Sequence, residues 1–311
     1  MIKKSVIFLI LVFLTFHFSL FTSHASFSSK DKGTATAGFL KLGVGARAVS
    51  MGEAYSALAD EASAMHWNVA GLRNIKSQSA TFMHAMYIES SFFDYLAYGK
   101  RINDKSAYGV SLQYLSAGSI DETDETGTTI GTFNPNDMAL TMGYARDFRN
   151  YSFGLGFKYI QSKIIDSATA FAFDFGILSP SYINNKLRLS FTGHNVGSKM
   201  KFEEEKEDLP MSFKLGSAYK LKDNWVSSLD IGFPKDNEPY FALGTEHLFP
   251  LQTWTLATRA GVNTRTLSDI DGFSGISFGV GFLYQKLMID YGFLPFGSVG
   301  TSHRLSLSAK F

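Results

Sequence analysis

The sequence has 311 residues, no cysteine and a formal net charge of +1, because 29 Lys and Arg side chains are balanced by 28 Asp and Glu. This balance argues against a nucleic-acid partner, which would require a basic excess, and the lack of cysteine excludes disulfides, thiolate nucleophiles and cysteine-based metal sites. Charged residues are only 18% of the chain and aromatic residues are 15%, whereas about 25% charge is usual for a soluble globular domain.

The chain begins with a predicted signal peptide over residues 1–25. Lys3 and Lys4 form a short positive region, an apolar run follows over residues 6–21, and small residues precede the expected cleavage site after Ala25. The alternative is an uncleaved membrane anchor, but the small residues directly after the apolar run favour cleavage and export. Beyond residue 25 no run of 18 apolar residues occurs, so the sequence offers no other transmembrane helix.

Residues 26–76 lack the alternation of a strand, and we predict that they form a hatch, or plug, that contains a short helix. Ser50 and Glu53 have the spacing of a capping box. The alternative is a periplasmic linker, but linkers rarely contain so many Tyr, Leu, Met and Trp residues. Apolar residues with helical spacing support the helix: they are Met51, Ala54, Tyr55, Leu58, Ala62 and Met65.

Residues 77–311 form a series of segments in which two kinds of side chain alternate. In the last segment, for example, Leu305 and Leu307 alternate with Arg304 and small polar residues. A soluble β-sandwich would carry Lys and Glu rather than Gly and Ser on its second face, so the pattern favours a membrane barrel with a lumen. Because a sheet in lipid must pair all its backbone groups, we expect it to be closed.

We predict an all-β fold, a transmembrane antiparallel up-and-down barrel of about fourteen strands. The even number puts both ends of the barrel in the periplasm, and this parity gives short periplasmic turns and mostly longer outer loops, as such barrels have. A barrel of this size encloses more space than side chains fill, so the hatch is expected inside it. The predicted strands are residues 77–88, 92–101, 105–116, 135–148, 151–163, 168–179, 186–196, 209–221, 225–233, 238–248, 251–263, 273–284, 286–294 and 301–311.

Eight charged residues in these strands should point into the lumen. Unpaired charge in a barrel wall is costly, so we expect them to pair with one another or with the hatch. The alternative is that they set the polarity of a conducted path. They are Lys158, Asp174, Arg188, Lys214, Glu246, Arg259, Asp290 and Arg304.

Other polar residues do not predict a catalytic, cofactor or metal site. The acidic clusters at residues 121–125 and 203–208 could bind Ca²⁺ or bridge cations to lipid A, but such runs are more often solvated surface. No Ser/His/Asp order or nucleophile motif is present, so we predict that the protein is not an enzyme. Five histidines are scattered without the spacing of metal ligands, at His66, His84, His194, His247 and His303.

Residues 37–52, 54–60 and 66–72 resemble the N-terminal signature of the PorV/PorQ family, outer-membrane barrels related to the FadL fatty-acid transporters. The C-terminal stretch over residues 295–307 is also similar to that family. The middle of the chain resembles it only in barrel pattern and length, and Asn68-Val69-Ala70-Gly71 stands where the family usually has Asn-Pro-Ala-Gly. The hatch residues that match the signature are Gly43, Gly45, Arg47, Gly52, Asp60, Trp67, Asn68 and Gly71.

The resemblance implies a fourteen-stranded barrel with an N-terminal hatch, and two alternative roles. PorV-like members act in type IX secretion, where they receive exported proteins leaving the translocon, and this is the role that we expect first. FadL-like members pass hydrophobic small molecules inward, and a purely structural role is a third reading, because fold alone does not decide function. The other expected partners are outer-membrane lipid and the barrel assembly machinery, with the terminal Phe311 as the assembly signal.

Overall fold

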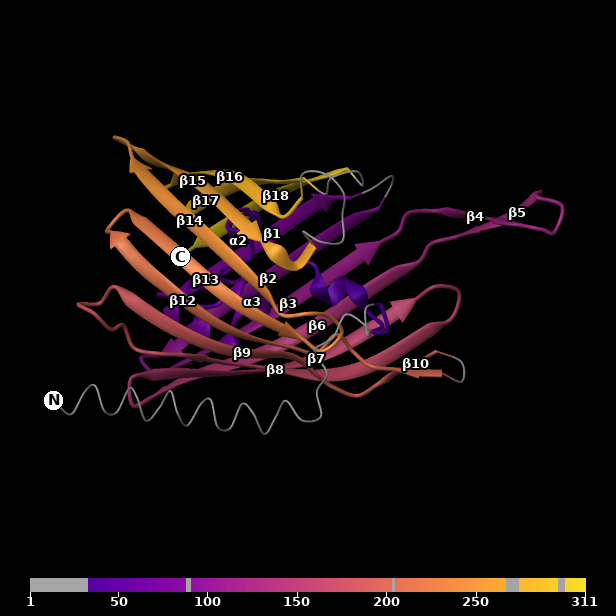
Figure 1. Ribbon diagram of the computed structural model, residues 1–311, viewed down its shortest axis with the longest axis horizontal. Coiled ribbons are helices and arrows are strands. Elements are labelled where there is room, and N and C mark those ends of the chain that lie inside the picture. Colours follow the sequence, from indigo (N-terminus) through magenta and orange to yellow (C-terminus); the bar gives the residue numbers. More distant parts are fainter. Residues whose placement is uncertain (1–32, 88–90, 203–204, 267–273, 296–299) are drawn as a thin grey trace.

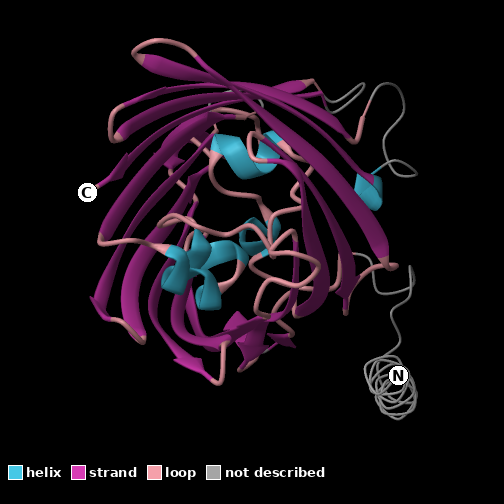
Figure 2. Cartoon of the chain, turned by 90° about the vertical axis from the view of Figure 1, so that its left-hand side faces the viewer, coloured by secondary structure: helices cyan, strands magenta, loops and turns pink. Residues whose placement is uncertain are grey.

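The computed structural model describes residues 33–311 except residues 88–90, 203–204, 267–273 and 296–299. The predicted signal peptide, its cleavage after Ala25 and the start of the predicted hatch lie outside the described residues. Within the described part of the chain, no helix is long and apolar enough to cross a membrane. Most described residues belong to strands, which surround a few short helices (Figure 2).

Fourteen antiparallel strands form one closed barrel, which confirms the predicted fold (Figure 1). Neighbouring barrel strands follow one another along the chain, and the barrel closes where the first strand pairs with the last, with Ser79 opposite Lys310. The strands are β1 (Gln78–Met86), β2 (Phe92–Asn103), β3 (Ser106–Ser116), β6 (Asn136–Phe148), β7 (Tyr151–Lys163), β8 (Ser167–Leu178), β9 (Leu187–Gly197), β12 (Ser212–Lys222), β13 (Trp225–Pro234), β14 (Tyr240–Pro250), β15 (Trp254–Asn263), β16 (Ile276–Tyr284), β17 (Leu287–Pro295) and β18 (Thr301–Lys310).

Some strands begin two or three residues later than predicted, for local reasons. Pro210 has no N–H to donate to a sheet, and β12 begins beyond it, at Ser212. The N–H of Leu251 donates to the carbonyl oxygen of Trp254 at 2.8 Å. This bond closes a turn, so β15 begins only at Trp254.

The alternation seen in the sequence separates two faces of the barrel wall. Leu305 is 55% exposed on the outer face, whereas its neighbour Arg304 is 2% exposed on the inner face. Aromatic rings cover much of the outer face, as where Phe157 stacks on Phe171 with 5.7 Å between ring centroids. In an outer membrane this face meets lipid hydrocarbon, while the inner face encloses the lumen.

The two ends of the barrel differ in the length of their connections. The turn end carries Phe311 and short connections, such as the two-residue turn between β6 and β7. Arg149 and Asn150 in this turn have φ angles of 48° and 71°, as a type I′ turn requires, and such a turn fits the twist of the flanking strands. The opposite end, here called the loop end, carries mostly longer connections.

Two small hairpins stand at the loop end, where the sequence predicted only loops. They are formed by β4 (Ile120–Thr123) with β5 (Thr129–Phe133), and by β10 (Met200–Phe202) with β11 (Glu205–Glu207). The first projects well beyond the barrel (Figure 1). Sequence alternation did not reveal these hairpins because their strands are short and, in β4, exposed on both faces.

The hatch, residues 33–77, lies inside the barrel (Figure 2). Its amino-terminal part is at the loop end, where the N–H of Thr36 donates to the carbonyl oxygen of Asp208 at 3.1 Å. Its carboxyl-terminal part leads into β1 at the turn end. The short helices described in it are η2 (Gly38–Lys41), α2 (Ala46–Ser50), α3 (Ala64–Trp67) and η3 (Val69–Asn74).

The position predicted for the hatch helix, after a capping box at Ser50 and Glu53, is wrong. Helix α2 ends at Ser50, whose hydroxyl donates to the carbonyl oxygen of Ala46 at 2.6 Å. Gly52 and Glu53 have φ angles of 65° and 67°, which an α-helix does not contain. The apolar residues of the hatch meet the wall on several sides, so they need not gather on one helical stripe.

Candidate functional site: the lumen and its hatch

Glycines on the inner wall let the hatch lie directly against the strands. A Cβ at Gly261 of β15 would overlap the backbone of Met51 and Gly52, and a Cβ at Gly176 of β8 would overlap the side chain of Asn68. The glycine-rich inner face that the sequence showed therefore has a packing reason. It leaves room for the backbone of the hatch.

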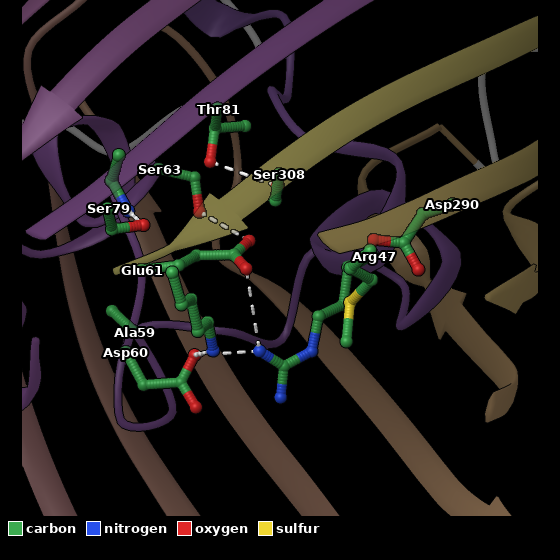
Figure 3. Close-up of polar contacts among 12 residues, drawn as sticks. Arg47, Ala59, Asp60, Glu61, Ser63, Ser79, Thr81, Asp290 and Ser308 are labelled. Atoms are coloured by element: carbon green, nitrogen blue, oxygen red, sulfur yellow. Dashed lines mark hydrogen bonds and ion pairs between the residues drawn. The ribbon is translucent and has the colours of Figure 1, made fainter. Parts of the chain in front are cut away.

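Arg47 of helix α2 ties the hatch to the wall. It also contacts Asp60 and Glu61 of the hatch itself (Figure 3). Its Nε and Nη2 donate to the two carboxylate oxygens of Glu246 in β14, both at 2.8 Å. Its Nη1 donates to Asp60 at 2.7 Å and to the hydroxyl of Tyr55 at 2.8 Å, and lies 3.8 Å from Glu61. One guanidinium thus joins a strand to two separate parts of the hatch.

The ion pairs continue from Glu246 around the wall. Arg259 of β15 lies 2.6 Å from Glu246 and 2.7 Å from Asp290 of β17. At the turn end Lys310 lies 3.7 Å from Asp60. We call Arg47, Asp60, Glu61, Glu246, Arg259 and Asp290 the Arg47 network.

Most of the Arg47 network is removed from solvent. The side chains of Arg259 and Asp290 are 0% and 1% exposed. Removing one partner of a buried ion pair leaves a charge with neither water nor a counter-ion, which costs about 3–5 kcal/mol. The network therefore favours one fixed position of the hatch at the turn end.

A second ion pair of the lumen lies beside an irregularity in the wall. Lys158 of β7 is 2.9 Å from Asp174 of β8, and its Nζ donates to the amide oxygen of Asn195 at 2.6 Å. The pairing of β8 with β9 shifts register at this point, between Phe173 and Phe175. Asn195 has a φ of 57°, and its N–H donates to Asp174 at 2.8 Å. The Asp174 carboxylate therefore also stabilises this register shift, a β-bulge.

Three of the eight predicted lumen charges contact the hatch and, among the described residues, have no carboxylate within ion-pair distance. Arg188 donates to the amide oxygen of Asn74 at 3.1 Å. Arg304 donates to the carbonyl oxygen of Gly43 and, at 2.5 Å, to the hydroxyl of Tyr87. The third is Lys214. The structure thus places all eight residues on the inner wall, five of them in ion pairs.

Polar residues of the predicted hatch signature fix local turns. The amide oxygen of Asn68 accepts the N–H of Ala70 at 3.0 Å and so caps η3, while its amide nitrogen donates to the carbonyl oxygen of Ser56 at 2.9 Å. The indole of Trp67 donates to the carbonyl oxygen of Val44 at 2.9 Å. The bonds to Ser56 and Val44 join segments of the hatch that are more than ten residues apart in the chain.

The glycines of the signature lie where the chain is tight. Gly45, with a φ of 78°, directly precedes α2, and the N–H of Gly52 donates to the hydroxyl of Ser277 at 3.0 Å. A Cβ at Gly43 would meet the carboxylate of Glu53 at 2.6 Å, and one at Gly71 would meet the carbonyl oxygen of Ala59 at 2.6 Å. The signature residues therefore shape and seat the hatch.

Asp230 of β13 is a hatch-binding residue that the sequence analysis missed. Its carboxylate accepts the N–H of Ser56 at 3.1 Å, the N–H of Tyr55 at 3.3 Å and the hydroxyl of Ser56 at 2.9 Å. The signal was present, because Asp230 lies between the apolar Leu229 and Ile231 and so belongs to the inner face.

The loop end anchors the start of the hatch through Asp208. Its carboxylate accepts from Lys235 at 2.8 Å and lies 3.2 Å from Lys199. The bonds from these two lysines lower the pKa of Asp208 from its ordinary value, so the carboxylate is charged at neutral pH. Asp208, whose carbonyl oxygen accepts the N–H of Thr36, is thus itself held in place by two ion pairs.

The acidic hairpin between β4 and β5 uses one of its carboxylates to form its turn. Asp124 accepts the N–H groups of Thr126 and Thr128, both at 2.9 Å, and the hydroxyl of Thr126 at 2.6 Å. In the part of the chain that the structure describes, no group of three or more His, Asp or Glu side chains could hold a metal ion. Asp124 has a structural explanation in the turn.

A small cavity lies between the hatch and the wall at the loop end. Its volume is about 50 Å³, and its lining includes His66, Trp67, Lys158, His194 and Lys214. A cavity that holds benzene measures about 150 Å³, whereas one water needs about 10–15 Å³. The space therefore fits a few waters or a small polar group but not an aromatic hydrocarbon.

The chain end completes the barrel at the turn end. The N–H of Phe311 donates to the carbonyl oxygen of Gln78 at 2.9 Å, and its side chain is largely exposed. The role of Phe311 as an assembly signal stays a prediction.

Comparison with known proteins gives a family and a set of similar folds. The family model for "Type IX secretion system protein PorV" matches residues 26–231. The Ralstonia pickettii toluene transporter TbuX has a TM-score of 0.61 at 11% identity, over 86% of this chain and 98% of that chain. The P. putida toluene transporter TodX has a TM-score of 0.59 at 11% identity, over 86% and 99%.

A Pseudomonas aeruginosa FadL homologue is also similar, with a TM-score of 0.56 at 12% identity, over 89% of this chain and 98% of that chain. At such low identity these likenesses show the fold alone. No curated protein sequence matches the chain.

Proposed function

The chain belongs to the family of the type IX secretion system protein PorV, and from this premise we propose that it is a non-enzymatic barrel that receives exported proteins. Its family and fold are those of outer-membrane barrels. In such barrels the short turns face the periplasm and the longer loops face outward. The loop end is then the surface that an exported protein meets as it leaves the translocon.

The contents of the lumen support this role over the passage of an apolar solute. The hatch is bound to the wall by charges and hydrogen bonds, of which those of Arg47 and Asp230 are the most extensive. The loop-end cavity, at about 50 Å³, is too small for a hydrocarbon. A protein that docks on the loop end needs no path through the lumen.

The projecting hairpin of β4 and β5 supports a protein partner. Ile120 and Ile130 are 41% and 62% exposed on it, close to the carboxylates of Asp121 and Glu122. Since the hairpin extends beyond the barrel wall (Figure 1), these apolar side chains are not explained by contact with lipid. Exposed on a segment that stands away from the barrel, these side chains are accessible to a protein partner.

The test is a pull-down of the tagged protein from detergent-solubilised outer membranes, combined with deletion of its gene. We expect secreted proteins or a large translocon to copurify, and we expect the deletion to abolish their display at the cell surface. A variant with aspartate at positions 120 and 130 should fail to restore display. A variant with Thr132→Ser, a conservative change on the same hairpin, should restore it. Unchanged display in the deletion strain would contradict the proposal.

Passive transport of hydrophobic small molecules is a second candidate, and the register shift between β8 and β9 favours it. The register shift lies beside Asn195, which also lines the loop-end cavity. On the outer face the ring of Phe175 occupies the space beside Gly193, where a Cβ would overlap it. Movement of this ring would leave a thinner wall between the cavity and the lipid.

Uptake of toluene and of a fatty acid into proteoliposomes tests this candidate. Transport predicts uptake that Phe175→Ala increases, while Phe157→Ala, on an intact part of the wall, leaves it unchanged. Equal uptake with and without the barrel would exclude passive transport of these two solutes.

A further inference from the structure

Lys214 is a buried cation without a carboxylate partner. The residue is 8% exposed, and its Nζ lies 4.9 Å from the ring centroid of Trp67. No carboxylate oxygen of the described residues lies within 4.0 Å of this ammonium group. Because a buried lysine is normally paired with an acid, we expect the ammonium group of Lys214 to bind a negatively charged partner.

The other cations around the loop-end cavity have such partners. Lys41 lies 2.7 Å from Asp236, and Arg265 lies 3.0 Å from Glu53. Lys158 is paired with its neighbour in β8 at 2.9 Å. Lys214 is therefore the cation of this lining that has no ion-pair partner among the described residues.

Asp230, which faces the lumen from the neighbouring strand, does not neutralise this charge by direct contact. Its register partner in β12 is Gly216, two residues from Lys214. Its two oxygens accept hydrogen bonds from Tyr55 and Ser56 of the hatch. The carboxylate is thus occupied with holding the hatch.

His66 adds a second donor to the same cavity. The side-chain nitrogen of Gln113 lies 3.1 Å from His66 Nδ1; because an amide nitrogen only donates, Nδ1 accepts, and a neutral ring carries its proton on Nε2. The ring packs against Trp67 with 4.8 Å between ring centroids. Lys214 and His66 both line this one small space.

We propose that this cavity is a carboxylate-binding site, in which Lys214 and His66 bind the head group of a ligand that enters from the loop end. A volume of about 50 Å³ fits a carboxylate group but not the chain attached to it. The remainder would lie outside, beside Lys41, whose side chain is 39% exposed. The source of the carboxylate rests on the proposed function: an exported polypeptide supplies it in secretion, and a fatty acid supplies it in transport.

The fluorescence of Trp67 reports binding, because a carboxylate that attracts Lys214 changes the charge at the indole. Trp225→Phe and Trp254→Phe leave Trp67 as the only tryptophan of the intact barrel in non-ionic detergent. We expect acetate, but not chloride at equal ionic strength, to give a saturable change. Lys214→Gln should weaken acetate binding at least about tenfold, since a charge-assisted hydrogen bond is lost.

Two further variants make the result specific. Lys220→Gln, an exposed lysine of the same strand, should bind acetate as the parent does, and Lys214→Arg should retain binding. If Lys214→Gln does not fold, His66→Phe removes the second donor and should weaken binding several-fold. No saturable change with acetate, or equal binding by the variants at positions 214 and 220, would overturn the site.

Octanoate and a short peptide distinguish the two sources. Binding of a peptide with a free C-terminus, but not of its amidated form, supports a polypeptide ligand, whereas much tighter binding of octanoate than of acetate supports a lipid. Both results support the site if they depend on Lys214. Because acetate binding by the purified barrel requires no translocon, this experiment tests the site independently of the role in secretion.

Discussion

At the turn end of the lumen, two arginines meet four carboxylates within the Arg47 network, and nearly every donor of Arg47 has a partner on the hatch or the wall. At the loop end, Lys214 lies over the ring of Trp67 and lines a small cavity, and no carboxylate of the described residues is within ion-pair distance of it. The same hatch and the same kind of wall enclose both regions. The comparison shows that inward charge fixes the hatch where partners are matched, and leaves a place for a ligand where one partner is missing.

The largest expected effect is at the turn end. Arg47→Met should lower the free energy of unfolding by about 3–5 kcal/mol, because Glu246 and Asp60 lose a buried partner. The loss can be measured from the urea dependence of the mobility shift between folded and unfolded barrel on gels. Arg146→Met, an exposed arginine of β6, is the control and should change little. Equal effects would mean that the network does not fix the hatch.

Asp230→Ala should have the next largest effect. It leaves two N–H groups and a hydroxyl of the hatch without their acceptor, and each unsatisfied buried group costs about 1–3 kcal/mol. We expect partial release of the hatch, measured as faster hydrogen exchange over residues 54–58. Exchange at the rate of the parent protein would show that Asp230 is dispensable.

The sequence could predict the barrel because each strand repeats one signal. Leu305 and Arg304 differ in polarity, and the closed sheet places one in contact with the membrane and the other with the lumen. The hatch has no such repeat. Its residues meet the wall on several sides, so the helical spacing after Ser50 did not correspond to a helix. The positive φ of Glu53 could not be predicted, because no sequence pattern indicates it.

The candidate site was predictable only in part. Alternation was enough to place Lys214 and Arg259 on the inner wall, but it did not indicate that Arg259 would have two carboxylates nearby and Lys214 none. Such pairing depends on register between strands and on the path of the hatch, both of which are set by long-range packing. The bulge at Asn195 escaped the sequence analysis for the same reason.

A smaller effect is expected where the hatch backbone touches the wall. Gly261→Ala places a methyl group against Met51 and Gly52, and overpacking of this kind costs about 1–3 kcal/mol. Gly38→Ala, where a Cβ would have nothing within 4 Å, is the matched control. The midpoint of unfolding should fall for the first variant only, and a fall in both would contradict the packing explanation.

The smallest effect is expected at the loop end. Lys214→Met keeps most of the side-chain volume and removes a charge whose only described contact is the ring of Trp67. A cation–π contact contributes about 0.5–2 kcal/mol, and the removal of an unpaired buried charge offsets that loss, so stability should change by less than about 1 kcal/mol. A loss as large as that of Arg47→Met would mean that Lys214 helps to fix the position of the hatch and is not part of a binding site.

Hydrogen–deuterium exchange of the intact barrel, with and without a secreted protein that copurifies with it, tests the division between the two ends most directly. We predict that the partner protects residues 119–133 and 205–216 at the loop end, and leaves the slow exchange of residues 46–50 at the turn end unchanged. Protection at the turn end, or no change at the loop end on binding, would contradict the account.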